Sequence, residues 1–225
     1  MLKYFQTTTL ILAWCFILSV VWSGLVWKWV TLRSRVMPVM PKTSGALRSR
    51  LLLPALVIAP LALAGFYHGL GLNLLYPIHA FASSGELLMA AIIPALVLVL
   101  SSGLFTTLRD SIRMDFMHWR CRPFSLTLVA YGYSLPGRLR RLVLLRSLVR
   151  GWNQCLPWLF GELIIVEAVF NAPGLGLDCW NLAKMKEYSG LLQSLIWLTA
   201  LYGVCAFLSA MVSGWIGRRL KSYGG

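Results

Sequence analysis

Residues 7–30 read TTTLILAWCFILSVVWSGLVWKWV, a continuous apolar run in which Lys28 is the one charged side chain. A helix of about 20 apolar residues crosses the hydrocarbon core of a membrane. The run is longer than the apolar core of a signal peptide and shows no clear small-x-small cleavage site. It therefore predicts a transmembrane helix that is retained in the protein.

The composition of the whole chain also indicates a membrane protein. Of the 225 residues, 58% are hydrophobic and 12% are charged, whereas soluble domains carry about 25% charged residues. So few charges cannot cover a surface in water, which argues against a soluble enzyme, a disordered chain and a disulfide-stapled secreted domain. The five cysteines are scattered and odd in number, so they predict no disulfide framework.

Four further apolar runs predict an all-α, polytopic membrane protein with five transmembrane helices. The prolines inside these runs are compatible with membrane helices if neighbouring groups satisfy the freed backbone carbonyls. We expect one transmembrane domain of residues 1–225, in which residues 109–151 form the longest stretch without a span. The predicted spans cover about residues 7–30, 51–72, 86–108, 152–170 and 190–216.

The 21 lysines and arginines are distributed unevenly between these spans. Eighteen lie in residues 28–50, in residues 109–151 and after residue 216, and three lie in the other segments. Because cytoplasmic loops are rich in Lys and Arg, we expect the N-terminus outside and the C-terminus in the cytoplasm. This topology makes residues 109–151 cytoplasmic, and it places Cys179 outside and Cys121 inside. The net charge of +14 then indicates topology rather than nucleic-acid binding.

The chain carries none of the common catalytic motifs. It has no GxxxxGK[ST] loop for phosphate, no HExxH and no GxSxG. His68 and His79 could share a metal ion, but ordinary interfacial histidines explain them more simply. We therefore predict no catalytic residue, no metal site and no cofactor.

Two glutamates lie in the fourth predicted span. Glu162 is near its middle, where an acidic side chain facing lipid costs about 2.5–3.5 kcal/mol. Glu162 should therefore face protein, either as part of a transport pathway or as a buried, hydrogen-bonded group. Glu167 lies one turn from the outer end, where we expect it to reach the interface. The two are about 140° apart around the helix and form no catalytic pair.

Residues 161–176, GELIIVEAVFNAPGLG, contain a marked change from apolar helix to turn. Asn171 and Pro173 should end the helix at the outer membrane surface. Gly174 and Gly176 should then permit a tight turn.

This segment resembles the VExVFxxPGLG signature of ABC-transporter permeases for dipeptides, oligopeptides and nickel. Eight residues match at the signature's spacing: Val166, Glu167, Val169, Phe170, Pro173, Gly174, Leu175 and Gly176. The resemblance implies that Glu162, Glu167, Pro173, Gly174 and Gly176 belong to the pathway or the outer turn.

A second region resembles the EAA loop, through which such permeases contact their ATPases. Gly137 and the basic-apolar segment Val143–Arg150 match, whereas Tyr133 stands where the family has alanine. The resemblance implies that Tyr133, Gly137 and Arg138 contact the ATPase. The family's first span has no counterpart here.

The resemblance implies a permease of an ABC importer in the inner membrane of a bacterium. Its expected partners are a second permease subunit, two ATPase subunits, an extracytoplasmic substrate-binding protein and the lipid bilayer, but no nucleic acid. The substrate would be a peptide, nickel or a metal-chelating small molecule. The alternative is a structural or regulatory membrane subunit that derives from such a permease and does not transport.

Overall fold

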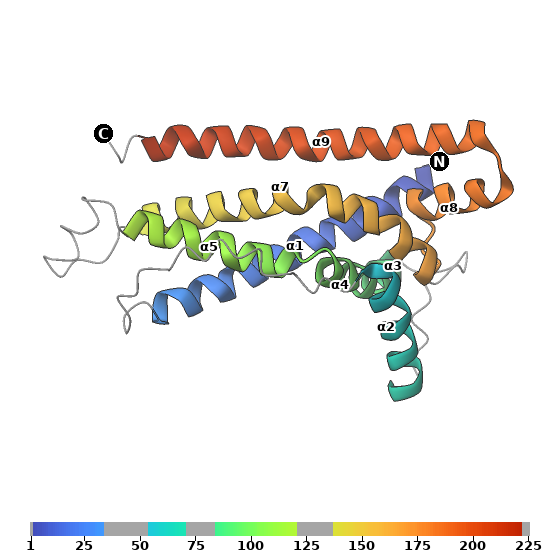
Figure 1. The fold of residues 1–225 in the computed structure, drawn as a ribbon, viewed down its shortest axis with the longest axis horizontal. Coiled ribbons are helices and arrows are strands. Elements are labelled where there is room, and N and C mark those ends of the chain that lie inside the picture. Colours follow the sequence, from blue (N-terminus) through green and yellow to red (C-terminus); the bar gives the residue numbers. More distant parts are fainter. Residues whose placement is uncertain (1, 34–53, 71–83, 121–136, 222–225) are drawn as a thin grey trace, which may run out of the picture. The chain divides into compact units, whose positions relative to one another are not determined.

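The computed structural model describes residues 2–33, 54–70, 84–120 and 137–221, and nearly all of them are helical (Figure 1). These ranges contain no strand, so the all-α prediction is confirmed for them. The helices are α1 (Leu2–Arg33), α2 (Ala55–Leu70), α3 (Ser84–Ala90), α4 (Ile92–Ser101), α5 (Leu104–Arg120), α7 (Gly137–Phe170), α8 (Leu175–Met185) and α9 (Tyr188–Lys221).

Within the described ranges, three helices are long and apolar enough to cross a membrane, namely Tyr4–Thr31 of α1, Leu139–Phe170 of α7 and Tyr188–Leu220 of α9. The chain is therefore membrane-embedded by length and composition. A bent helix pair raises the number of candidate spans to four. Helix α2 has 16 residues, or about 24 Å at 1.5 Å per residue, which is shorter than the ~30 Å hydrocarbon core. The predicted span at residues 51–72, and with it the count of five spans, therefore stays a prediction.

The predicted span 86–108 is not one continuous helix. Helix α4 ends at Ser101, and α5 begins at Leu104 after a bend of 59°. Gly103 lies at the break with a φ of 66°, a backbone conformation that only glycine adopts without steric cost. Hydropathy did not show this break, because only Ser101, Ser102 and Gly103 separate two apolar segments.

The predicted cytoplasmic element 109–151 is helical at both ends. Helix α5 continues to Arg120, and α7 begins at Gly137, well before the predicted start of the fourth span at residue 152. Helix α5 continues because it is amphipathic, with an apolar stripe that packs inside, while Arg109 and Arg113 stay exposed. The stripe consists of Leu104, Leu108, Ile112, Phe116 and Trp119.

The chain divides into two compact units, and α1, α7 and α9 each contribute to both. The first unit comprises Met1–Leu18, Leu51–Gly103 and Cys155–Cys205. The second unit comprises Ser19–Arg50, Leu104–Gln154 and Ala206–Gly225.

Each unit has its own apolar core. In the first unit, the Trp14 indole N–H donates to the Leu88 carbonyl (2.9 Å), and Cys15 lies 3.5 Å from the Ala95 carbonyl. These contacts attach α1 to α3 and α4. In the second unit, α1 packs against α5 and α7 through Val26, Val30, Ile112 and Phe116, with Trp22, Trp27 and Leu144 around them.

Candidate functional site

Helix α7 ends in a Schellman-type turn, after which the chain enters α8. Asn171 takes a left-handed φ of 52°, which asparagine tolerates better than most residues. The backbone N–H of Ala172 then donates to the Glu167 carbonyl (2.9 Å), and Pro173 prevents the helix from continuing. The prediction that Asn171 and Pro173 end this helix is confirmed.

The Glu167 side chain lies under this turn, completely buried. Its carboxylate accepts hydrogen bonds from the Thr8 hydroxyl (2.8 Å) and from the backbone N–H groups of Gly176 (2.7 Å) and Leu177 (3.3 Å). Thr8, which is also fully buried, accepts a hydrogen bond from the Leu175 N–H (2.8 Å). We call Thr8, Glu167 and the N–H groups of residues 175–177 the α8 cap.

The α8 cap satisfies the free end of a helix with side chains from two other helices. The first N–H groups of any helix lack partners within it, and the residue at the N-cap position here, Gly174, has no side chain to supply one. Thr8 of α1 and Glu167 of α7 accept the N–H groups of Leu175, Gly176 and Leu177 instead. The helix dipole is positive at this end, so it also stabilises the carboxylate.

Gly174 and Gly176 are required by close packing rather than by backbone conformation. Gly174 is extended, with a φ of −113°, and a Cβ atom there would lie 2.2 Å from a Glu167 carboxylate oxygen. A Cβ atom on Gly176 would lie 2.7 Å from the Ile164 Cα. The expectation that these glycines permit a tight turn is therefore corrected, since they make room for Glu167 and for the backbone of α7.

Glu167 also differs from its prediction. We expected its side chain to reach the membrane interface, but it turns inward and is completely buried. The α8 cap explains this difference, because three hydrogen-bond donors of α1 and α8 take the place of the water that would solvate the carboxylate at the interface. Sequence reasoning missed Thr8, because three threonines, residues 7–9, stand together at the start of this run and the sequence does not distinguish between them.

Glu162 has different partners in the same unit. Its carboxylate accepts a hydrogen bond from the Ser101 hydroxyl (2.5 Å), at the end of α4. The backbone N–H of Ala55, the first residue of α2, donates another. Glu162 thus faces protein, as predicted, and joins three helices. Its role in a pathway stays a prediction.

Helix α8 is attached to α9 by Ser194, whose hydroxyl donates to the Asp178 carboxylate (2.5 Å). The neighbouring Cys179 is buried, at 4% exposure. This burial, with the negative charges of Asp178 and Glu167 in addition, raises the pKa of the Cys179 thiol to about 11. The placement of Cys179 outside stays a prediction, and labelling of Cys179 would not test it, because a buried thiol of high pKa reacts slowly.

A second buried carboxylate, Asp115, lies in the second unit and joins α5 to α7. It is 4% exposed, forms an ion pair with Arg150 (2.8 Å) and accepts a hydrogen bond from the Ser147 hydroxyl (3.0 Å). We call these three residues the Asp115 cluster. Sequence reasoning missed it, although Asp115 lies beside Phe116 of the apolar stripe, where a buried acid needs a partner.

The predicted ATPase contacts lie at the start of α7. Gly137 and Arg138 are its first two residues, whereas Tyr133 lies outside the described residues. The segment Val143–Arg150 is helical and is continuous with the following span. Among the residues that the structure describes, no three metal-ligating side chains come together.

No protein-family model matches the chain, and no curated protein matches it. The functional interpretation therefore depends on residues 161–176 and their geometry. In that geometry, the buried Glu167 carboxylate joins the end of α7 to the start of α8. The residues of the α8 cap pack against one another.

Proposed function

We propose that the chain is the transmembrane permease subunit of an ATP-driven importer. The observation that supports this most is that three residues of the permease-like signature meet in one place. Glu167 accepts the N–H of Gly176, and Gly174 leaves the space that the Glu167 carboxylate occupies. Because Glu167, Gly174 and Gly176 take part in one contact, that contact explains why the signature combines an acid with two glycines at this spacing.

The continuity of α7 suggests how such a subunit would work. One helix carries Gly137 at its first residue and Phe170 at its last, so it links the predicted ATPase contact to the turn before α8. The Asp115 cluster attaches its N-terminal part to α5. An ATPase that displaces residues 133–138 would therefore move α5 and α7 together rather than α7 alone.

The energy and the substrate would come through partners. The chain has no phosphate-binding loop, so two ATPase subunits would hydrolyse ATP. A second permease subunit would complete the pathway, and an extracytoplasmic binding protein would deliver a peptide, nickel or a metal chelate. The membrane would be the inner membrane of a bacterium, with the C-terminus in the cytoplasm.

The test is a pair of matched substitutions at the first turns of two long helices. Gly137→Asp introduces an acid at the start of α7, and Ser189→Asp introduces one at the exposed second residue of α9. An acid in a helix's first turn is compatible with folding, so both variants should insert normally. We expect Gly137→Asp to abolish co-purification of an ATPase and substrate uptake, and Ser189→Asp to preserve both.

Normal uptake by the Gly137→Asp variant would show that this segment does not couple to an ATPase. If the unmodified chain co-purifies with an ATPase but supports no uptake of peptides, nickel or chelates, a regulatory subunit is the better interpretation. That alternative draws support from the candidate spans, of which the described residues contain three or four rather than five. Co-purification of no ATPase at all would contradict both functions.

A further inference from the structure

The second unit carries most of the positive charge of the chain and almost no negative charge. Its residue ranges contain 18 of the 21 lysines and arginines but only two acids, Asp110 and Asp115. Both acids already form ion pairs, with Arg109 (3.2 Å) and Arg150 (2.8 Å) respectively. The unit therefore has no further carboxylate to offer to its other basic side chains.

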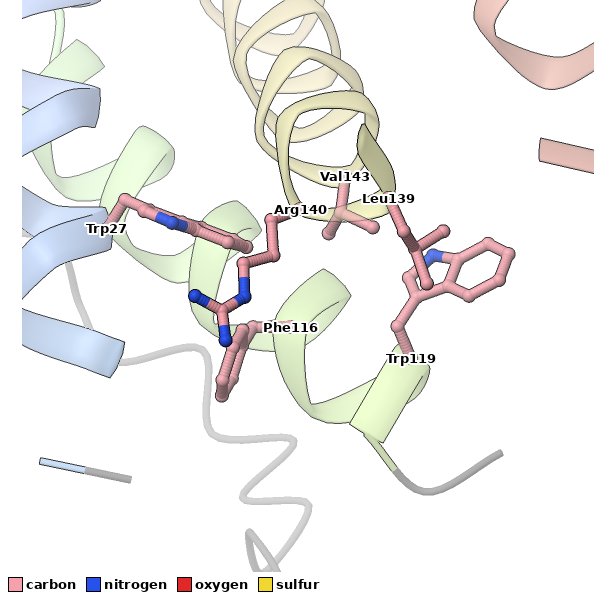
Figure 2. Close-up of a pocket in the computed structure, with 6 residues that line it drawn as sticks. All are labelled: Trp27, Phe116, Trp119, Leu139, Arg140 and Val143. Atoms are coloured by element: carbon pink, nitrogen blue, oxygen red, sulfur yellow. The ribbon is translucent and has the colours of Figure 1, made fainter. Parts of the chain in front are cut away.

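One of those basic side chains, Arg140, lines a small pocket between three helices. Figure 2 shows it extending from α7 toward Trp27 of α1 and Phe116 of α5, while Leu139 points toward Trp119. Phe116, Trp119 and Leu139 are buried, whereas Arg140 is partly exposed. The pocket therefore has one partly exposed cationic side chain in a lining that is otherwise aromatic and aliphatic.

The pocket lies at the ends of two candidate spans. The span Tyr4–Thr31 ends four residues after Trp27, and the span Leu139–Phe170 begins one residue before Arg140. Tryptophan is enriched at the level of the lipid headgroups, and arginine at a span end extends its charge to that level. The pocket is thus positioned for the headgroup of a lipid.

We propose that this pocket binds the phosphate group of an acidic phospholipid. The Arg140 guanidinium can donate two parallel hydrogen bonds to phosphate. The partly exposed Trp27 ring would pack against the glycerol and the first methylene groups, with Phe116 behind it. The excess of 18 basic over two acidic residues in this unit favours a lipid with a net negative charge over a zwitterionic one. The apolar lining favours a lipid over free phosphate, and nothing in this proposal depends on a transport function.

The experiment is a lipid titration of the purified chain in detergent, followed by native mass spectrometry. We expect saturable binding of phosphatidylglycerol and weaker binding of phosphatidylcholine. Arg140→Gln should weaken phosphatidylglycerol binding by about tenfold, which is ~1.4 kcal/mol. The matched control is Arg141→Gln, which removes the same charge from an exposed neighbour outside the pocket, and it should change the affinity less than about twofold.

Three outcomes would overturn the proposal. An equal loss in the two variants would mean that diffuse charge attracts the lipid. Displacement of the lipid by an equal concentration of inorganic phosphate would indicate a free-anion site. Absence of saturable phosphatidylglycerol binding by the unmodified chain would exclude the site without any substitution, so the test does not depend on the folding of a variant.

Discussion

Glu167 in the first unit and Asp115 in the second are both buried carboxylates that join helices, but they are compensated differently. Glu167 receives its hydrogen bonds from Thr8 and from two backbone N–H groups of α8, and no described cation lies within ion-pair distance of it. Asp115 pairs with Arg150, whose side chain is 40% exposed. The compensation of Glu167 depends on the position of the N-terminus of α8, whereas that of Asp115 depends on the charge of Arg150.

The difference follows from what each environment provides. A buried charge needs hydrogen bonds or an opposite charge. A helix N-terminus supplies oriented donors and positive potential without bringing a second charged side chain into an apolar region. Arg150 keeps 40% of its side chain exposed, so part of its guanidinium can stay hydrated while it pairs. We therefore expect the α8 cap to be sensitive to shape and the Asp115 cluster to be sensitive to charge.

The largest contrast that we predict is in accessibility from the two sides of the membrane. Lys184 of α8 and Arg113 of α5 are both exposed, and each can be replaced by cysteine. A membrane-impermeant maleimide on intact cells should label the Lys184→Cys chain above the unmodified background. The Arg113→Cys chain should be labelled only after the cells are permeabilised. Labelling in the opposite pattern would contradict the topology that the charge distribution predicts.

Removing the Glu167 carboxylate should be the most destabilising substitution. Glu167→Leu leaves the N–H groups of Gly176 and Leu177 buried without an acceptor, and we expect a loss of about 3–5 kcal/mol in the free energy of unfolding. Glu167→Gln keeps one acceptor oxygen and should lose about 1–2 kcal/mol. Unfolding in mixed detergent micelles, followed by tryptophan fluorescence, measures both. Equal losses would mean that the hydrogen bonds of the cap contribute little.

Gly174→Ala tests the sensitivity of the α8 cap to shape without changing any charge. Its Cβ atom would lie 2.2–2.3 Å from three atoms of the Glu167 carboxyl group, so we expect a loss of about 1–3 kcal/mol. Gly161→Ala is the control in the same unit, because a Cβ atom there meets nothing within 4 Å. The same unfolding assay should find Gly161→Ala at least as stable as the unmodified chain. Equal stability of the two variants would refute the close-packing explanation.

The Asp115 cluster should give the smallest effect. Arg150 is partly exposed and can be hydrated, and Asp115 shares the single Ser147 hydroxyl hydrogen with the Val143 carbonyl (2.9 Å). We expect Asp115→Asn to lose about 1 kcal/mol. In a double-mutant cycle with Arg150→Gln, the coupling energy should fall as salt is added. A coupling energy that salt does not change would indicate packing rather than charge as the basis of this contact.

Several features could be predicted from the sequence because they depend on neighbouring residues. Apolar runs produced the helices α1, α7 and α9, since a run long enough to span a membrane must satisfy its backbone within itself. The end of α7 at Phe170 follows from Asn171 and Pro173, whose local conformations stop a helix. The continuation of α5 beyond residue 108 was missed, although the spacing of Leu108, Ile112 and Phe116 contains that information.

The sequence by itself thus determined that the described part of this membrane protein is helical, where its longest helices lie and where α7 ends. Only the tertiary structure decided that Thr8 meets Glu167, 159 residues away, and that Gly174 must lack a side chain because Glu167 occupies that space. It likewise decided the pairing of Asp115 with Arg150. The physical reason is that hydropathy and helix-ending signals act over a few residues. The compensation of a buried charge depends on which distant donor the packing brings within 3 Å.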